Sequence, residues 1–186
     1  GWKSPIYCDN RLTLSHPSIR TYIRQKLTSL VQDDFGSVAL VAGVATAGVP
    51  QGVLVAQELG LPFVYVRDKA KNHGKGNLIE GEFFEGQRVV VVEDLISTGK
   101  SSLQAVKALR NAGCEVAGLV SIFSYGFDIA NKNFKSANCR YATLCDYNAL
   151  IEYAANNNFI STDDLLLLRK WRENPAEWGK SIETLA

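Results

Sequence analysis

Apolar runs alternate with helix-like patterns between residues 37 and 122 of the chain. The runs are rich in valine, are bounded by Gly or Pro, and cover residues 37–44, 62–66, 88–94 and 115–123. Between them, helical spacing predicts one helix from about Pro50 to Leu59 and another from Ser101 to Ala112. Continuous apolar runs of this length are typical of strands buried on both faces, as in a parallel sheet covered by helices. The pattern therefore predicts an α/β fold.

Further helices are expected on either side of this region. Residues 18–31 carry apolar side chains at helical spacing, which would pack on one face of the sheet: Ile19, Tyr22, Ile23, Leu27, Leu30 and Val31. Ser161 and Asp164 form a capping-box pattern that predicts the start of a helix over 162–173. No linker, repeat or low-complexity stretch divides the 186 residues, so we expect a single domain over 1–186.

The segment 67–86 breaks the alternation. It is polar and glycine-rich, is basic in its first half, and separates two strongly predicted strands. Connections longer than about 12 to 15 residues are uncommon in compact domains unless they are functional loops or disordered. The segment is therefore predicted to be a mobile loop or a long hairpin.

The composition limits the possible partners. Lys and Arg total 20 against 19 Asp and Glu, so the bulk charge favours neither nucleic acid nor a membrane surface. The four cysteines lack C-x-x-C spacing and there are two histidines, which argues against a zinc site and for free thiols in a reducing compartment. No apolar stretch reaches the roughly 18 residues of a membrane span, and we expect a cytoplasmic protein.

Unusual segments follow three of the predicted strands: residues 43–50, the basic loop from Arg67, and residues 93–102. In open α/β sheets, ligands bind outside the carboxyl ends of the strands. The sequence therefore predicts one site to which all three segments contribute.

Residues 97–102 are the candidate phosphate site. They lie between a buried strand and the start of a helix, where hydroxyls and exposed N–H groups meet the positive end of the helix dipole. The alternative is that these hydroxyls only cap the helix. A Walker A loop is excluded despite the "GKS" at 99–101, because it requires glycine at position 94 and the chain has Asp94.

Two adjacent acids, Glu93 and Asp94, precede this loop. Carboxylates accept hydrogen bonds from vicinal hydroxyls, and they can help to hold a hydrated Mg²⁺ whose other ligands come from a substrate. The acids fit a ligand that carries a ribose beside its phosphate.

The stretch 89–102 resembles the ribose-phosphate signature of type I phosphoribosyltransferases. Residues 65–81 are similar to the mobile catalytic loop of the orotate phosphoribosyltransferases, and 3–11, 43–50 and 146–154 are similar to other segments of that family. The resemblance implies a central, mainly parallel sheet flanked by helices, with a small hood region and a mobile catalytic loop. It also implies that a helix and a strand precede Gly1.

The resemblance also implies roles for individual residues. Arg67, Lys71 and His73 would be catalytic and would contact the diphosphate of 5-phosphoribosyl 1-diphosphate. The rest of that substrate would be bound by Glu93, Asp94, Leu95, Ile96, Ser97, Thr98, Gly99, Lys100 and Ser101. Ser97 would also contact orotate. Mg²⁺ would be held mainly by the substrate, near Glu93 and Asp94, with no direct protein ligand.

Alternatives remain for the basic loop and for the segment 43–50. Lys69, Lys71, His73 and Lys75 could form no more than a solvated basic loop. Residues 43–50 match the family's diphosphate-binding turn and also fit a tight strand-to-helix turn. In the family the loop closes over the site of the neighbouring subunit, which implies a homodimer with shared active sites.

The resemblance implies transfer of ribose 5-phosphate to orotate in pyrimidine synthesis. One alternative is a phosphoribosyltransferase for another base, and a second is a non-catalytic regulator that senses the diphosphate sugar. The chain has Asp68 where many relatives have a basic residue. Some relatives also place an arginine near the base site, after the strand that ends within residues 121–128, and this chain has no arginine there. Ser97, Lys3 and backbone N–H groups are candidates to hold the orotate carboxylate, and Tyr125 either contacts the base or is a core residue.

Overall fold

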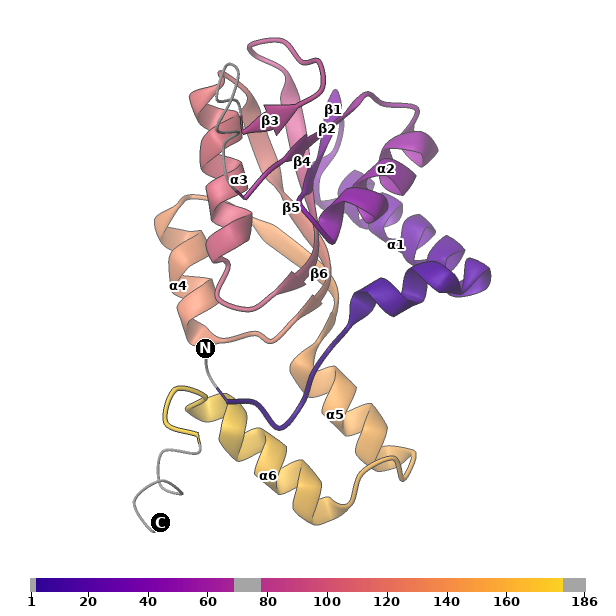
Figure 1. Cartoon of the computed structure of the whole chain (residues 1–186), viewed down its shortest axis with the longest axis vertical. Helices are drawn as coiled ribbons and strands as arrows, with labels where there is room; N and C mark the ends of the chain where they lie inside the picture. The colour runs from indigo at the N-terminus through magenta and orange to yellow at the C-terminus, as the bar shows by residue number, and fades with distance from the viewer. Residues whose placement is uncertain (1–2, 69–77, 179–186) are drawn as a thin grey trace. The chain divides into compact units, whose positions relative to one another are not determined.

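The structure of the chain, a computed structural model, describes residues 3–68 and 78–178. It forms two compact units (Figure 1). The larger unit is Asn10–Leu144, and the smaller one brings Gly1–Asp9 together with Cys145–Ala186. Within the described ranges, every helix is too short or too polar to cross a lipid bilayer.

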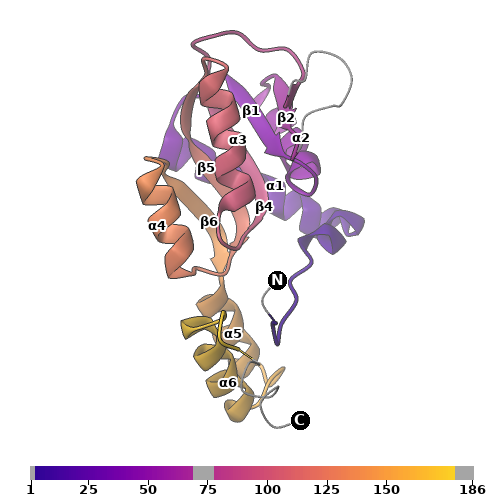
Figure 2. The same ribbon diagram turned by 60° about the vertical axis from the view of Figure 1, so that its left-hand side comes forward.

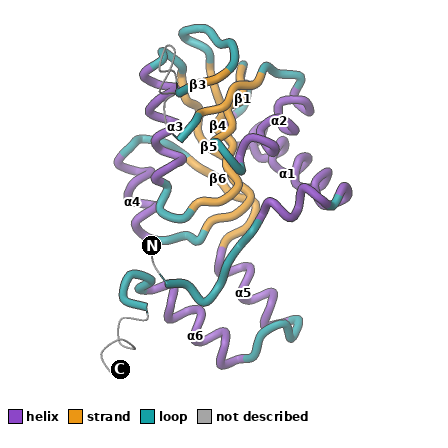
Figure 3. The backbone as a smooth tube through the Cα atoms, in the orientation of Figure 1, coloured by secondary structure: helices purple, strands orange, loops and turns teal. Residues whose placement is uncertain are grey.

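The larger unit is built on a six-stranded sheet with the strand order β3-β2-β1-β4-β5-β6 (Figure 3). Its strands are β1 (Leu40–Val44), β2 (Phe63–Val66), β3 (Ile79–Glu80), β4 (Arg88–Ile96), β5 (Glu115–Ser124) and β6 (Tyr141–Asp146). β1 pairs in parallel with β2 and β4, β4 pairs in parallel with β5, and β3 is antiparallel to β2. The predicted α/β class and mainly parallel sheet are confirmed.

Helices cover both faces of this sheet (Figure 2). A short 3₁₀ helix, η1 (Asn10–Ser15), precedes α1 (Pro17–Phe35), and α2 (Gly48–Leu59), α3 (Lys100–Asn111) and α4 (Asp128–Ser136) follow. α1 and α2 lie on one face, and α3 and α4 lie on the other.

The four valines of β4 show how the two faces are filled. Val89 and Val91 pack in the core under α3 and α4, whereas Val90 and Val92 pack in the core under α1 and α2. All four are 0 % exposed. A strand between two helical layers needs apolar residues at consecutive positions, because successive side chains point to opposite faces.

β4 continues further than its sequence pattern predicted. The apolar run was expected to end at Glu93 and Asp94, but the strand extends to Ile96. The extension is paired with β5, where Leu95 lies opposite Phe123 and Ile96 lies opposite Ser124. The two acids are therefore inside a strand, and the phosphate loop begins after it.

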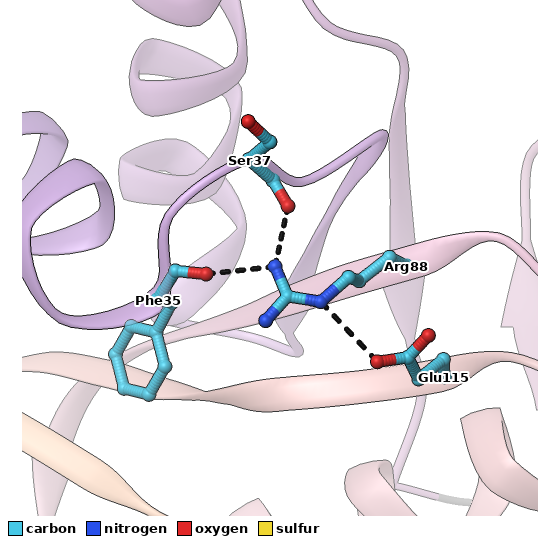
Figure 4. Close-up of polar contacts among 4 residues, drawn as sticks. All are labelled: Phe35, Ser37, Arg88 and Glu115. Carbon is cyan, nitrogen blue, oxygen red and sulfur yellow. Dashed lines mark hydrogen bonds and ion pairs between the residues drawn. The ribbon is translucent and has the colours of Figure 1, made fainter.

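An arginine ties elements together at the amino ends of β4 and β5 (Figure 4). Arg88 Nη1 donates to the carbonyl oxygens of Phe35, at 2.7 Å, and of Ser37. Its Nε pairs with Glu115 Oε1 at 3.2 Å. The end of α1 and the start of β1 are thus fixed to β4 at the edge opposite the carboxyl ends of the strands.

The smaller unit contains α5 (Tyr147–Asn156) and α6 (Thr162–Glu173). The predicted capping box of Ser161 and Asp164 is confirmed at the start of α6. The rings of Tyr147 and Trp171 pack with centroids 5.4 Å apart, and the Trp171 indole N–H donates to the Lys3 carbonyl at 3.2 Å. This bond joins the start of the chain to α6 within the unit.

Candidate active site

The described parts of the three segments singled out from the sequence, with Arg67 and Asp68 standing for the basic loop, lie at the carboxyl ends of the strands. They follow β1, β2 and β4, and β1 lies between the other two strands. One cavity of about 610 Å³ is lined by Ala45, Thr46, Val49, Pro50, Tyr65, Arg67 and Asp68. A second, of about 690 Å³, is lined by Asp68, Leu95, Ser97, Thr98, Gly99, Lys100, Ser101, Ser102 and Gln104. Asp68 lines both cavities, so they are neighbouring parts of one site.

The turn after β1 packs closely against β4. A Cβ on Gly48 would lie 2.6 Å from the Val92 carbonyl oxygen, so this position has no room for a side chain. The Ala45–Thr46 peptide bond is cis, and the Ala45 N–H donates to the Val66 carbonyl at 2.9 Å. Gly48 therefore lets the start of α2 lie directly beside Val92 and Glu93 of β4.

The phosphate loop enters α3 through Gly99. This residue is the N-cap and has φ 77°, in the left-handed region that glycine adopts without strain. Glycine has no side chain, so the N-cap residue donates or accepts no side-chain hydrogen bond at the start of α3. The loop residues 97–99 and the first two residues of α3, Lys100 and Ser101, line the second cavity, as a phosphate site requires.

Two residues of α4 contact this loop, and the sequence pattern did not reveal them. Asn133 Nδ2 donates to the Thr98 carbonyl oxygen at 2.9 Å. A Cβ on Gly99 would lie 2.6 Å from a ring atom of Phe134. Neither residue belongs to a recognisable motif, so only the fold reveals the contact.

Glu93 is held by protein groups on both carboxyl oxygens. Its Oε1 accepts from the Asp94 N–H at 3.1 Å, and its Oε2 accepts from the Ser102 hydroxyl at 3.2 Å. The side chain is 4 % exposed. Burial first, and then the hydrogen bond to the Asp94 side chain and its charge, raise the pKa of Glu93 from 4.5 to about 8, although the Asp94 N–H and the Ser102 hydroxyl act in the opposite direction. The folded protein therefore favours the protonated form of Glu93 more than an exposed position would.

Asp94 has different surroundings. Its side chain is only half-buried, and its carbonyl oxygen accepts from Asn10 Nδ2 at 2.9 Å. The first residue of η1 is thereby joined to β4 beside the site.

Arg67 is the catalytic candidate that the structure describes. Its Nη1 lies 3.3 Å from Glu80 Oε1, and its N–H donates to the Leu78 carbonyl at 2.8 Å. Arg67 directly follows β2 and Leu78 directly precedes β3, and these two strands pair antiparallel. The other predicted cations of the loop, Lys69, Lys71, His73 and Lys75, lie outside the described residues.

Tyr125 lies just beyond β5 in a row of aromatic rings. Its ring is stacked on Phe127, with centroids 5.3 Å apart and planes at 3°, and it meets Phe123 edge-on at the same centroid distance. Its N–H donates to the Ile96 carbonyl at 3.0 Å. These contacts give Tyr125 a packing role, and its ring is half-buried.

Known proteins with similar sequences identify the family of this chain. The model of the phosphoribosyl transferase domain matches residues 13–150. The orotate phosphoribosyltransferase of Porphyromonas gingivalis is 52 % identical over 179 residues, which cover 96 % of this chain and 85 % of that protein. The chain belongs to the orotate phosphoribosyltransferase family.

Solved structures support the same assignment. The orotate phosphoribosyltransferase from Aeropyrum pernix superposes with a TM-score of 0.75 at 28 % identity, covering 85 % of this chain and 86 % of that one. The Mycobacterium tuberculosis H37Rv enzyme in complex with 5-phospho-alpha-D-ribosyl 1-diphosphate gives a TM-score of 0.66 at 28 % identity, covering 78 % and 83 %. The predicted type I phosphoribosyltransferase fold is confirmed, and the chain is a phosphoribosyl-transferring enzyme.

Proposed function

We propose that the chain transfers the ribose 5-phosphate group of 5-phosphoribosyl 1-diphosphate to orotate, giving orotidine 5′-monophosphate and diphosphate in pyrimidine nucleotide synthesis. The observation that carries this proposal is the continuity of β4, its acids and the phosphate loop at the start of α3. Relatives about half identical over nearly the whole chain are named for this activity.

The two cavities suggest where the parts of the sugar substrate bind. The 5-phosphate would lie at residues 97–101, where backbone N–H groups and the α3 dipole favour an anion. Asp94 would accept hydrogen bonds from the ribose hydroxyls, because it is the more exposed of the two acids. The diphosphate would lie against the turn after β1 and Arg67, which line the first cavity.

In the reaction, the bond from the anomeric carbon to the diphosphate breaks, a bond from that carbon to a ring nitrogen of orotate forms, and that nitrogen releases its proton to solvent. The diphosphate leaves with the bonding electrons, so negative charge develops on it in the transition state. Arg67 would stabilise that charge, and we assign the same role to Lys71 and His73 from the family resemblance.

Family membership indicates a metal-dependent reaction, and we propose Mg²⁺ as the metal. Among residues 3–68 and 78–178, no group of three or more His, Cys, Asp and Glu side chains is placed to hold a metal ion. Mg²⁺ usually keeps several of its waters and binds substrate phosphates, so the substrate would hold the ion and Asp94 would accept hydrogen bonds from its waters. When bound, the ion would neutralise charge on the diphosphate.

We further propose that the enzyme is a cytoplasmic homodimer with shared active sites. The basis for the shared site is the similarity of residues 65–81 to a loop that reaches the neighbouring subunit in the family. Sedimentation of the purified protein would test the dimer, and cell fractionation would test the location.

An assay of orotate consumption tests the proposed reaction. Orotate should be consumed only when 5-phosphoribosyl 1-diphosphate and Mg²⁺ are both present, and adenine, hypoxanthine and uracil should not replace it. Turnover of a purine in its place would favour the alternative base. Binding of the diphosphate sugar without turnover of any base would favour the regulator.

A further inference from the structure

Helix α4 contacts the phosphate loop through two consecutive residues. Asn133 donates to the Thr98 carbonyl oxygen at 2.9 Å, and the Phe134 ring fills the space that a Cβ on Gly99 would need. Phe134 is 1 % exposed, so its ring is a fixed part of the core. The loop therefore rests on α4 as well as on β4 and α3.

The first contact determines the direction of a neighbouring N–H group. Thr98 and Gly99 are joined by a trans peptide, in which the carbonyl and the following N–H point in opposite directions. Since the Thr98 carbonyl points to Asn133, the Gly99 N–H points away from α4.

The next peptide is also held in place. The Gly99 carbonyl accepts from the Leu103 N–H at 2.9 Å, as the first bond of α3. Both peptide groups that flank Gly99 therefore have fixed orientations, one set by α4 and the other by α3. Gly99 itself lines the cavity at the start of the helix.

We propose that Asn133 is a positioning residue of the phosphate site, which holds the Thr98 carbonyl so that the Gly99 N–H is directed at the bound 5-phosphate. The assignment rests on the proposed function, in which this loop binds the 5-phosphate of the sugar substrate. Without the Asn133 amide, the Thr98–Gly99 peptide is free to rotate. Part of the binding free energy of the ligand is then used to orient the Gly99 N–H, so the affinity falls.

Ligand fragments and two variants test the proposal. Asn133→Ala removes the amide, and Asn133→Asp keeps its size but replaces the donor by an acceptor. Both variants should raise KM for 5-phosphoribosyl 1-diphosphate about tenfold, the effect of one lost hydrogen bond, with kcat within about twofold of wild type. Competitive inhibition by ribose 5-phosphate should weaken by the same factor, while inhibition by diphosphate should not change.

Asn131→Ala is the matched control. Asn131 lies on the same helix and carries the same amide, but its Oδ1 accepts from the Tyr141 hydroxyl at 2.6 Å. Its removal perturbs α4 without touching the loop. Ribose 5-phosphate inhibition should stay at the wild-type level in this variant, and thermal unfolding of all three variants would report any loss of fold.

Several outcomes would overturn the assignment. It is wrong if a folded Asn133 variant binds ribose 5-phosphate as wild type does, if diphosphate inhibition weakens equally, or if Asn131→Ala has the same effect. Wild-type protein that neither binds ribose 5-phosphate nor consumes orotate would instead overturn the proposed function, and the assignment with it.

Discussion

Glu93 and Asp94 are neighbours in sequence, but they have different surroundings. The Glu93 carboxyl is buried and bound on both oxygens, whereas Asp94 is half-buried at the site. Residue types alone indicated a pair of sugar-binding acids. They could not indicate that the pKa of Glu93 is raised, because the burial of its carboxyl depends on how α2 and α3 pack against β4.

Glu93→Gln is expected to flatten the pH dependence of stability. The pKa of Glu93 is raised to about 8 in the folded protein, against 4.5 for an ordinary Glu. The protonated Glu93 therefore adds to the free energy of unfolding, and this contribution is fully present below pH 4.5. It is lost as the pH rises towards 8, by up to about 1.4 kcal/mol per pH unit. Gln does not titrate, so the variant should gain stability relative to wild type over this range.

Urea unfolding at pH 5, 6, 7 and 8 would measure this difference. Parallel curves of unfolding free energy against pH for the two proteins would show that Glu93 does not hold a proton in the folded state.

Asp94→Asn should weaken the binding of 5-phosphoribosyl 1-diphosphate roughly tenfold, since an amide is a poorer acceptor for ribose hydroxyls and a poorer partner for hydrated Mg²⁺. The unfolding free energy should change little, because Asp94 is only half-buried and Asn keeps its size. Calorimetric titration would give the affinity, and wild-type affinity in the variant would remove the ribose role from Asp94.

At the scale of helices and strands, the apolar patterns located β1, β2, β4 and β5 and the main helices correctly, because consecutive buried valines admit few other structures. The weaker patterns gave no prediction for α4 or β6. α4 has nine residues and is largely polar, and β6 is only half-buried up to its exposed last residue, Asp146. Asn133 could not be found from the sequence, since 35 residues separate it from Thr98.

Arg88→Met should destabilise the fold without changing catalysis. The variant loses two charge-assisted hydrogen bonds to the carbonyls of Phe35 and Ser37, and we expect the unfolding free energy to fall by about 1–3 kcal/mol. Orotate turnover should be unchanged, because Arg88 is at the amino end of β4 and the site is at the carboxyl end. Denaturant unfolding and the orotate assay would measure the two effects.

Glu115→Gln separates the ion pair from these carbonyl contacts. The Glu115 side chain is 67 % exposed, so its loss should cost less than about 1 kcal/mol. If Glu115→Gln destabilised the protein as much as Arg88→Met, the ion pair rather than the carbonyl contacts would hold this corner of the sheet.

At the scale of the whole molecule, the rule that ligands bind at the carboxyl ends of parallel strands predicted which edge of the sheet holds the site. The order of the strands could not be read from spacing, although it is what brings the turn after β1 between Arg67 and the acids of β4. The site for the base is the part that sequence patterns describe least. Tyr125 is engaged by neighbouring rings, and no motif marks a partner for the orotate carboxylate.

Mixing two inactive variants tests the shared site. Lys71→Ala and Asp94→Ala should each give nearly inactive homodimers, one by loss of transition-state stabilisation and the other by loss of substrate anchoring. If Lys71 acts on the partner's site, each mixed dimer has one site with both groups intact. Random mixing makes about half of the dimers mixed, so recovery should reach at most about one quarter of wild-type activity.

Subunit exchange has to be verified separately, for example with two affinity tags. If mixed dimers form and activity stays at the level of the separate variants, Lys71 does not act across the interface.

The four buried valines of β4 also affect the chain before it has folded. A β-branched stretch without proline is prone to intermolecular pairing, and during synthesis β4 lacks its neighbour β5 until residues 115–124 have emerged. Arg88 stands directly before this stretch and Glu93 and Asp94 directly after it, which is where charged gatekeepers oppose aggregation. In the unfolded chain Glu93 has its ordinary pKa and is charged. We therefore expect a chain neutral at both acidic positions to accumulate in inclusion bodies.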